Sequence, residues 1–281
     1  MTGPVVCGVD FSDDSRRALR WAAFMARHLA QPLVVVHAVE PLLAAAAQVH
    51  YGADALPATV QPELDAFIAD AIDAGLAVRT TLTAGEPAST INGTALAKGA
   101  SVIVVGTQGL GQAGRLWFGS TTMRLLREST IPVLAIPPGA AARSEAPLRI
   151  SSIVVGTDFG AASRAAIDAG TKLGRLFGVP VTGLHAVPAI AAPARWNEFV
   201  AGAVDRAVDD ARARMAATVP ALWTSEVRSG DPARVLVDAA SGNDALIVVG
   251  LGGLAAGQRP GTTAYRVLCD ADAPVLAVPP G

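Results

Sequence analysis

The strongest constraint on the fold is an internal repeat that covers most of this sequence. Four short segments recur in the same order and at nearly constant separation, which indicates a tandem duplication. The four pairs are GVDFSDDSRRAL at 8–19 with GTDFGAASRAAI at 156–167, HAV at 37–39 with HAV at 185–187, GEPA at 85–88 with GDPA at 230–233, and IPVLAIPPG at 131–139 with APVLAVPPG at 273–281.

The duplication predicts two domains of similar architecture. We place them at residues 1–139 and 150–281, joined by the exposed linker AAARSEAPLR at 140–149, which is short, polar and contains proline. With 51% apolar residues in 281, each half can build its own core.

Within each half, short β-branched runs alternate with longer alanine-rich segments of helical spacing. This pattern is typical of parallel strands covered by helices, so we expect two doubly wound, Rossmann-like α/β domains, each with a five-stranded parallel sheet. The predicted strands are 4–9, 32–39, 76–83, 101–106 and 132–137 in the first half, and 151–156, 180–187, 221–228, 245–250 and 274–279 in the second. The predicted helices of the first half are 15–29, 62–75, 87–99 and 120–130.

Charge and composition exclude several function classes. The formal net charge is −2, so there is no global attraction to nucleic acid or to an anionic membrane. No apolar run approaches the roughly 20 residues needed to cross a bilayer, and the N-terminus lacks the pattern of a signal peptide, which favours a cytoplasmic location. The two cysteines and four histidines show no metal-ligand spacing, so we expect no metal site.

Polar and glycine positions converge on one edge of each predicted sheet. Asp10 and Asp158 follow the first strand of their halves, and Gly106 and Gly250 end the fourth. Doubly wound sheets bind ligands beyond the carboxyl ends of their strands, so this edge is the expected binding site in each half.

The glycine-rich loop after residue 106 can be interpreted in three ways. Gly109, Gly111 and Gly114 fit a dinucleotide fingerprint, but that motif belongs after the first strand of a Rossmann unit. A Walker A motif formed by Gly114, Gly119, Ser120 and Thr121 would lack its lysine. The remaining pattern is G-x2-G-x9-G-[ST], formed by Gly106, Gly109, Gly119 and Ser120. It uses the start of a helix, where unpaired N–H groups and partial positive charge attract a phosphate, and hydroxyl groups at 120–122 add donors.

At this point the chain resembles the universal stress protein family in its tandem-domain form, over nearly all of both halves. The resemblance implies an adenine nucleotide hydrolase-like fold, with VVGTQG and FGST as the ATP-binding loop, the aspartate on the nucleoside side, and the residue after the histidine of HAV flanking adenine. It nominates for the first half Gly8, Val9, Asp10, Ala38, Val105, Gly106, Gly109, Gly119, Ser120, Thr121 and Thr122, and for the second half Gly156, Thr157, Asp158, Ala186, Val249, Gly250, Gly253, Gly261, Thr262 and Thr263. It further implies that the last strands pair the two domains, with a homodimer as a further option.

The second half departs from the motif. Seven residues instead of nine separate Gly253 from Gly261, and Arg259 and Pro260 precede that glycine. The phosphate end of the loop survives, but a shorter and stiffer loop must cross the same gap. The number of nucleotides bound, one or two, therefore stays open.

Structural roles compete with the functional ones. His37 and His185 are expected to be hydrogen-bonded histidines rather than ligands. Asp10 could simply help to cap the following helix. Residues 42–58 are long for a connection and could form a lid or a partly helical spacer, and Arg115, Arg124 and Arg127 could neutralise phosphates or lie on a solvated face.

The sequence supports three functions, of which a cytosolic, ATP-binding regulatory protein stands first. No nucleophile with a neighbouring base and no acidic cluster for magnesium can be identified, so Mg²⁺ could come only with the nucleotide, and hydrolysis should be slow. The alternatives are an ATP-dependent enzyme of the same fold and a nucleotide-free scaffold that pairs through its last strands.

Overall fold

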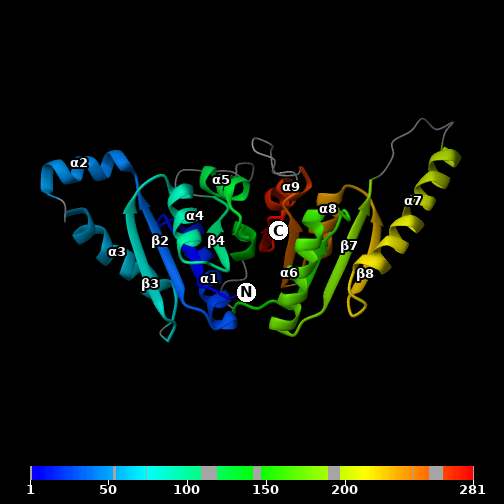
Figure 1. The fold of residues 1–281 in the computed structure, drawn as a ribbon, viewed down its shortest axis with the longest axis horizontal. Coiled ribbons are helices and arrows are strands. Elements are labelled where there is room, and N and C mark those ends of the chain that lie inside the picture. Colours follow the sequence, from blue (N-terminus) through cyan, green and yellow to red (C-terminus); the bar gives the residue numbers. More distant parts are fainter. Residues whose placement is uncertain are drawn as a thin grey trace. The chain divides into compact units, whose positions relative to one another are not determined.

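The computed structural model divides the chain into two compact units, residues 1–148 and 149–281. It describes residues 2–52, 55–73, 75–108, 119–141, 147–188, 197–242, 244–252 and 262–280. Both units are built from alternating strands and helices, and Figure 1 shows the order of these elements along the chain. The expected class, two Rossmann-like α/β domains with parallel sheets, is confirmed.

The first unit contains five strands and five α-helices within the described residues. In chain order these are β1 (Val5–Gly8), α1 (Asp13–Leu29), β2 (Leu33–Val39), α2 (Pro41–Tyr51), α3 (Ala55–Ala71), β3 (Val78–Ala84), α4 (Pro87–Ala97), β4 (Val102–Gly106), α5 (Ser120–Glu128) and β5 (Val133–Ile136), followed by a 3-10 turn, η1 (Pro138–Ala141). The strands lie in the order β3-β2-β1-β4-β5 and all neighbours are parallel.

The second unit repeats this arrangement with one fewer helix described. Its elements are β6 (Ser152–Gly156), α6 (Ala161–Phe177), β7 (Val181–Val187), α7 (Asn197–Thr218), β8 (Thr224–Ser229), α8 (Pro232–Ala240), β9 (Ala245–Gly250), α9 (Thr262–Asp270) and β10 (Val275–Val278). The parallel strand order β8-β7-β6-β9-β10 has the same topology as the first unit.

Helices pack on both faces of each sheet. Right-handed crossovers place α1 and α3 on one face of the first sheet, and α4 and α5 on the other. The contacts agree, because α1 packs against α3 and α4 packs against α5. In the second unit, α8 packs against α9 in the same way. The strands at the centre of each sheet are covered on both sides, which explains why β1 is buried at all four positions.

Helix α1 shows how the sequence produces this packing. Ser12 caps its first turn by accepting a hydrogen bond from the Ser15 N–H at 3.1 Å, and Ala30 ends it in a left-handed conformation. Small side chains at Ala18, Ala22 and Ala26, spaced one turn apart, are all fully buried. They let the helix lie close to β1 and β4.

Two predicted elements differ most from the structure. The helix expected around 62–75 covers Ala55–Ala71 and contains Pro62 as an interior residue. Its first turn includes Pro57, where a proline is tolerated because the N–H groups of a first turn have no partner within the helix. The strand expected over 221–228 begins only at Thr224. A turn closed by the Trp223 N–H and the Pro220 carbonyl at 2.9 Å takes up its predicted start.

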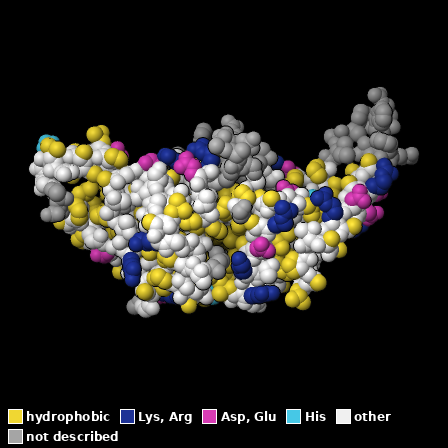
Figure 2. All heavy atoms as spheres, viewed as in Figure 1, with side chains coloured by type: hydrophobic (Ala, Val, Ile, Leu, Met, Phe, Trp, Pro, Cys, Tyr) yellow, Lys and Arg dark blue, Asp and Glu magenta, His cyan; other side chains and the backbone are white. Residues whose placement is uncertain are grey.

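The long connection after β2 is largely helical. Helix α2 covers most of residues 42–58, and α3 begins shortly after it, so the partly helical alternative describes this segment. None of the α2 residues is buried, and Figure 2 shows hydrophobic side chains gathered over this helix. The most exposed of them are Leu42, Leu43, Val49 and Tyr51. No helix within the described ranges has the length and apolar character to span a membrane.

Candidate functional site

A cavity of about 260 Å³ opens where β1 and β4 end side by side. The chain runs outward from β1 to β2 and β3 and then returns to β4 on the other side of β1, so the connections leave the sheet edge in opposite directions here. A crevice at such a switch point is where doubly wound sheets bind their ligands. We call it the first cavity.

The first cavity brings together almost all the residues that the sequence nominated in the first half. Its lining includes Gly8, Val9, Asp10, Ala38, Val105, Gly106, Gly119, Ser120, Thr121 and Thr122. Gly109, the remaining nominee, lies outside the described residues. Residues that are distant in sequence therefore meet at one site, as the strand topology requires.

Sequence reasoning missed five further lining residues, Ser15, Val36, Pro87, Ile91 and Gln108. Two of them carried a signal. Ser15 and Pro87 belong to segments that recur in the second half, as Ser163 and Pro232, and both of those residues line the corresponding cavity. Recurrence of single residues within the repeat could therefore have extended the predicted site.

The strand-end glycine Gly106 is required by the fold as well as lying at the site. A Cβ at this position would lie 3.0 Å from the backbone carbon and oxygen of Asp14, in the first turn of α1. The same holds at Gly250, where a Cβ would lie 2.3 Å from the carbonyl oxygen of Ala162 in α6. Both glycines let the start of a helix approach the end of a strand.

The start of α5 supplies the donors of the site. Its N-cap, Gly119, offers no side-chain acceptor to the first turn, and the first intrahelical bond runs from the Met123 N–H to the Gly119 carbonyl at 3.0 Å. The N–H groups at 120–122 precede that bond, at the end of the helix that carries partial positive charge. Helix α5 has no acidic residue in its first turn to oppose an anion.

Of the three hydroxyl groups expected to face a phosphate, one has a different role. Thr122 is 3% exposed, and its Oγ1 donates to the Gly106 carbonyl at 2.7 Å. The Gly119 N–H donates to the Thr107 carbonyl at 2.8 Å. These bonds attach the start of α5 to the end of β4. Ser120 and Thr121 are the residues whose hydroxyl groups can serve as donors to a ligand.

Asp10 supports the cap of α1 while lining the first cavity. Its Oδ1 accepts from the Ser12 N–H at 3.1 Å and from the Ser12 Oγ at 2.5 Å, and Ser12 in turn caps the helix. The capping role weighed from the sequence is therefore indirect. Asp10 also stands among the cavity residues, so the structural and functional roles coexist.

A second cavity, of about 130 Å³, occupies the same place in the second unit. Seven nominated residues line it, Gly156, Thr157, Asp158, Ala186, Val249, Gly250 and Thr263. Thr262 begins α9, whereas Gly253 and Gly261 lie outside the described residues. Ser163, Leu184, His185, Pro232, Leu236 and Ala264 complete the lining.

The carboxylate of Asp158 is held more tightly than a solvated one. Its Oδ1 accepts from the Gly160 N–H at 2.8 Å and from the Ser163 Oγ at 2.5 Å. Burial opposes the ionisation of Asp158, but these hydrogen bonds and the nearby His185 outweigh it and lower its pKa. The second cavity therefore presents a firmly anionic group at neutral pH.

The described residues contain no group of three or more histidine, cysteine or acidic side chains placed to hold a metal ion. Cys7 is buried in β1, and burial raises the pKa of its thiol, so it is an unreactive core residue.

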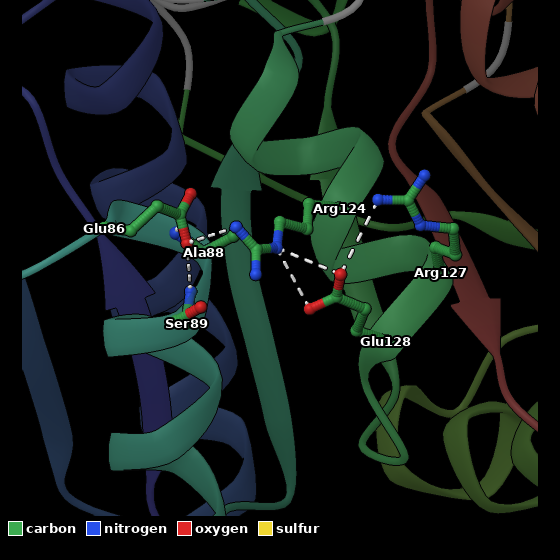
Figure 3. Close-up of polar contacts among 6 residues, drawn as sticks. All are labelled: Glu86, Ala88, Ser89, Arg124, Arg127 and Glu128. Atoms are coloured by element: carbon green, nitrogen blue, oxygen red, sulfur yellow. Dashed lines mark hydrogen bonds and ion pairs between the residues drawn. The ribbon is translucent and has the colours of Figure 1, made fainter. Parts of the chain in front are cut away.

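An acidic cap and an arginine tie two walls of the first cavity together, as Figure 3 shows. Glu86 caps α4 by accepting from the N–H groups of Ala88 at 3.2 Å and Ser89 at 2.8 Å. The guanidinium of Arg124 on α5 lies 3.1 Å from the Glu86 carboxylate and also bonds Glu128 at 2.9 Å. Arg124 is thus engaged by two carboxylates rather than aimed at a phosphate.

The same clasp recurs in the second unit with other residues. Asp231 caps α8 by accepting from the Arg234 N–H at 3.1 Å, and its other oxygen lies 2.5 Å from Arg266 on α9. In both units a helix cap is shared with an arginine of the helix that bears the phosphate end of the site. We define this arrangement, Glu86–Arg124 and Asp231–Arg266, as the cap–arginine clasp.

The clasp should contribute a small, acid-sensitive stabilisation. Burial opposes the ionisation of Glu86, but the hydrogen bonds from Ser89 and Ala88 and the charge of Arg124 lower its pKa. A carboxylate with a lowered pKa stabilises the fold above its unfolded-state pKa and loses that effect as the pH falls through the folded-state value. We therefore expect Glu86→Gln to lower the Tm slightly at about pH 7 and not at about pH 3, measured by circular dichroism.

Arg127→Gln is the matched control, because among the described residues the ion pair of Arg127 is with Glu128, at 3.6 Å, and not with the cap residue Glu86. An equal loss of Tm in both variants at neutral pH, or a loss in Glu86→Gln that persists in acid, would contradict the clasp.

Comparisons with known proteins identify the family. The model of the universal stress protein family matches residues 1–137 and again residues 150–279. The chain belongs to the universal stress protein family. The double match bears out the tandem-domain form that the sequence resembled.

Individual relatives agree with this assignment. A universal stress protein of Mycolicibacterium smegmatis is 28% identical over 189 residues, which cover 64% of this chain and 63% of that protein, so the match spans less than two thirds of it. One from Thermus aquaticus is 30% identical over 148 residues, 47% of this chain and 96% of that protein. The crystal structure of a universal stress protein from Archaeoglobus fulgidus has a TM-score of 0.68 at 15% identity, with 99% and 98% of the two chains covered, and shows the shared fold.

Proposed function

We propose that the first domain of this universal stress protein binds ATP or a related adenine nucleotide and acts as a nucleotide-dependent regulatory protein. The observation that carries the proposal is that two chemically different groups of residues line the first cavity. One group, on the strand ends and α4, is apolar and consists of Val9, Val36, Ala38, Ile91 and Val105. The other group is the donor-rich start of α5.

Such a lining matches an amphiphilic anion with a flat, weakly polar end. The N–H groups and hydroxyls at 120–121 suit phosphate oxygens, because a helix start combines unpaired donors with partial positive charge. The apolar group suits a purine base, which gains most from leaving water. Asp10 lines the same cavity just beyond the end of β1, which lies between β2 and β4, and its carboxylate accepts hydrogen bonds, so it suits the hydroxyl groups of a sugar.

We propose a non-catalytic role for the bound nucleotide. The described part of the first cavity presents no nucleophile beside a general base, and no lysine lines it. Magnesium would arrive with the phosphates. The second cavity could hold the same ligand between Asp158, Ala186 and Thr263. Its shortened loop makes one nucleotide per chain the first expectation. Pairing through the last strands, homodimer formation and a cytoplasmic location stay predictions.

The nucleotide content of the purified protein tests this proposal. We expect acid denaturation to release adenine nucleotide, which ion-exchange chromatography identifies. About one equivalent per chain indicates a single occupied site, and about two equivalents indicate both. If the purified protein carries no nucleotide, calorimetric titration with ATP, ADP and AMP measures whether it binds them. Absence of released nucleotide together with no binding at millimolar concentration would overturn the proposal.

A further inference from the structure

One strained residue stands beside the aspartate of each cavity. Phe11 has a φ of 65° and Phe159 a φ of 64°, both in the left-handed region. A bulky side chain seldom adopts this strained conformation, and residues that do adopt it cluster at functional sites. The two residues occupy equivalent places in the repeat, directly after Asp10 and Asp158. Both copies have thus kept the strain, so something must hold the turn.

A histidine holds this turn in both units. The His37 Nδ1 lies 2.9 Å from the Val9 carbonyl oxygen, and its ring centroid lies 4.6 Å from that of Phe11. A carbonyl can only accept, so Nδ1 must carry the hydrogen and donate it. The His37 side chain therefore holds Val9, the residue before Asp10, by a hydrogen bond, and Phe11, the residue after it, by ring contact. We call these two contacts the histidine grip.

The second unit reproduces this grip with nearly the same geometry. The His185 Nδ1 lies 2.8 Å from the Thr157 carbonyl oxygen, and its ring centroid lies 4.5 Å from that of Phe159. Two histidines that diverged after the duplication thus make the same two contacts. Agreement between the copies argues against a fortuitous arrangement.

Other groups close the turn from the remaining sides. The Val9 N–H donates to the Val36 carbonyl at 2.9 Å. The Phe11 ring also lies nearly perpendicular to the Phe67 ring, with centroids 5.5 Å apart. In the second unit, the guanidinium of Arg214 lies over the Phe159 ring, 4.1 Å from its centroid. The outer support differs between the units, whereas the histidine does not.

We propose that His37 and His185 are positioning residues for the nucleoside part of the ligand. Each histidine fixes the end of the first strand, where the aspartate faces the cavity. Its chain neighbour, Ala38 or Ala186, lines the same cavity from the adjacent strand. One residue pair in the second strand thus contributes to the cavity lining and holds the turn that carries the aspartate. The proposal rests on the proposed function of the first cavity.

Two near-isosteric substitutions separate positioning from mere packing. His37→Asn places an amide N–H where Nδ1 lies, whereas His37→Gln carries it one methylene further and misses the Val9 carbonyl. We expect calorimetry to show an ATP affinity within about threefold of wild type for His37→Asn and about tenfold weaker for His37→Gln, the latter being the size of one lost hydrogen bond. A packing role would not distinguish the two amides.

His28 provides a matched control. Its Nδ1 lies 2.9 Å from the Phe24 carbonyl oxygen and its ring 4.2 Å from that of Phe24, but it sits on α1 and is absent from the lining of the first cavity. His28→Gln should bind ATP as wild type does. Equal affinity in His37→Asn and His37→Gln, whether both are intact or both are weak, would overturn the proposal.

Hydrogen exchange distinguishes this failure from failure of the proposed function. If the wild-type protein binds no nucleotide, the function is wrong, but the grip can still be tested without ligand. Amides of residues 9–12 should then exchange about tenfold faster in His37→Gln than in His37→Asn, while those of α5 stay unchanged. Equal exchange in this turn would sink the positioning role itself.

Discussion

Replacing Gly119 with alanine should abolish most of the nucleotide affinity of the first domain without harming its fold. The backbone at Gly119 does not require glycine, since its φ is −59° and, among the described residues, a Cβ would come no closer than 3.5 Å, to the Thr107 carbonyl oxygen. A methyl group would instead stand where a phosphate approaches the N–H groups of α5. We expect ATP affinity to fall by at least about tenfold with only a small loss of Tm, because alanine is a poorer N-cap than glycine.

Gly93→Ala is the control for this experiment. Gly93 lies inside α4, where a Cβ would meet no atom within 4 Å. Alanine there should raise stability by up to about 1 kcal/mol and leave ATP binding alone. An undiminished affinity in Gly119→Ala would show that the phosphate does not approach the start of α5.

Gly250→Ala should mainly lower stability rather than ligand affinity, and the second domain should be destabilised. The added Cβ would lie 2.3 Å from the carbonyl oxygen of Ala162 and 2.4 Å from its carbon, and backbone atoms cannot move aside as a flexible side chain can. Helix α6 would have to retreat from the end of β9. We expect a loss of about 2–3 kcal/mol, at the upper end of overpacking effects.

Hydrogen exchange followed by mass spectrometry locates this damage. Exchange should rise in α6 and β9 of Gly250→Ala and stay at wild-type levels in α1 and β4. Gly252→Ala is the control, because its Cβ would lie at an ordinary 3.8 Å from the Ala162 Cβ. Similar exchange in the two variants would mean that the approach of α6 to β9 does not depend on a glycine.

The sequence predicted the fold well because the signals that specify it are local and repeated. Buried parallel strands need apolar side chains on both faces, so 101–106 and 245–250 were recognisable as strands without knowledge of their neighbours. Ends of elements were less certain. A helix was expected around 62–75, yet α3 begins at Ala55, and neither Pro57 in its first turn nor Pro62 in its interior marks its start.

The candidate site was predictable where chain topology alone brings residues together. Asp10 and Gly106 had to meet because both follow neighbouring parallel strands. The position of Thr122 was predicted, but not the direction of its hydroxyl, which bonds the Gly106 carbonyl instead of facing a ligand. Side-chain direction depends on helix phase at the first turn, which a sequence pattern does not resolve.

Two features needed three-dimensional coordinates. Phenylalanine at positions 11 and 159 gives no sequence signal of a left-handed backbone, because glycine or asparagine is the residue expected there. The cap–arginine clasp joins residues 38 positions apart in the first unit through the packing of two helices, whereas the sequence offered only a phosphate partner or a solvated helix face as roles for Arg124. Both features recur in the second unit.

The close approach of α1 to Gly106 and of α6 to Gly250 has a consequence for how one copy of a duplicated domain can lose its ligand-binding function during evolution. Selection for a folded protein alone would keep these strand-end glycines, because any larger residue would push a helix away from its sheet. A copy that no longer binds nucleotide would therefore still carry them. Gly119 has no such structural duty, so its position is the one free to drift after loss of function. In descendants of this duplication, that position is the one to inspect for a surviving binding site.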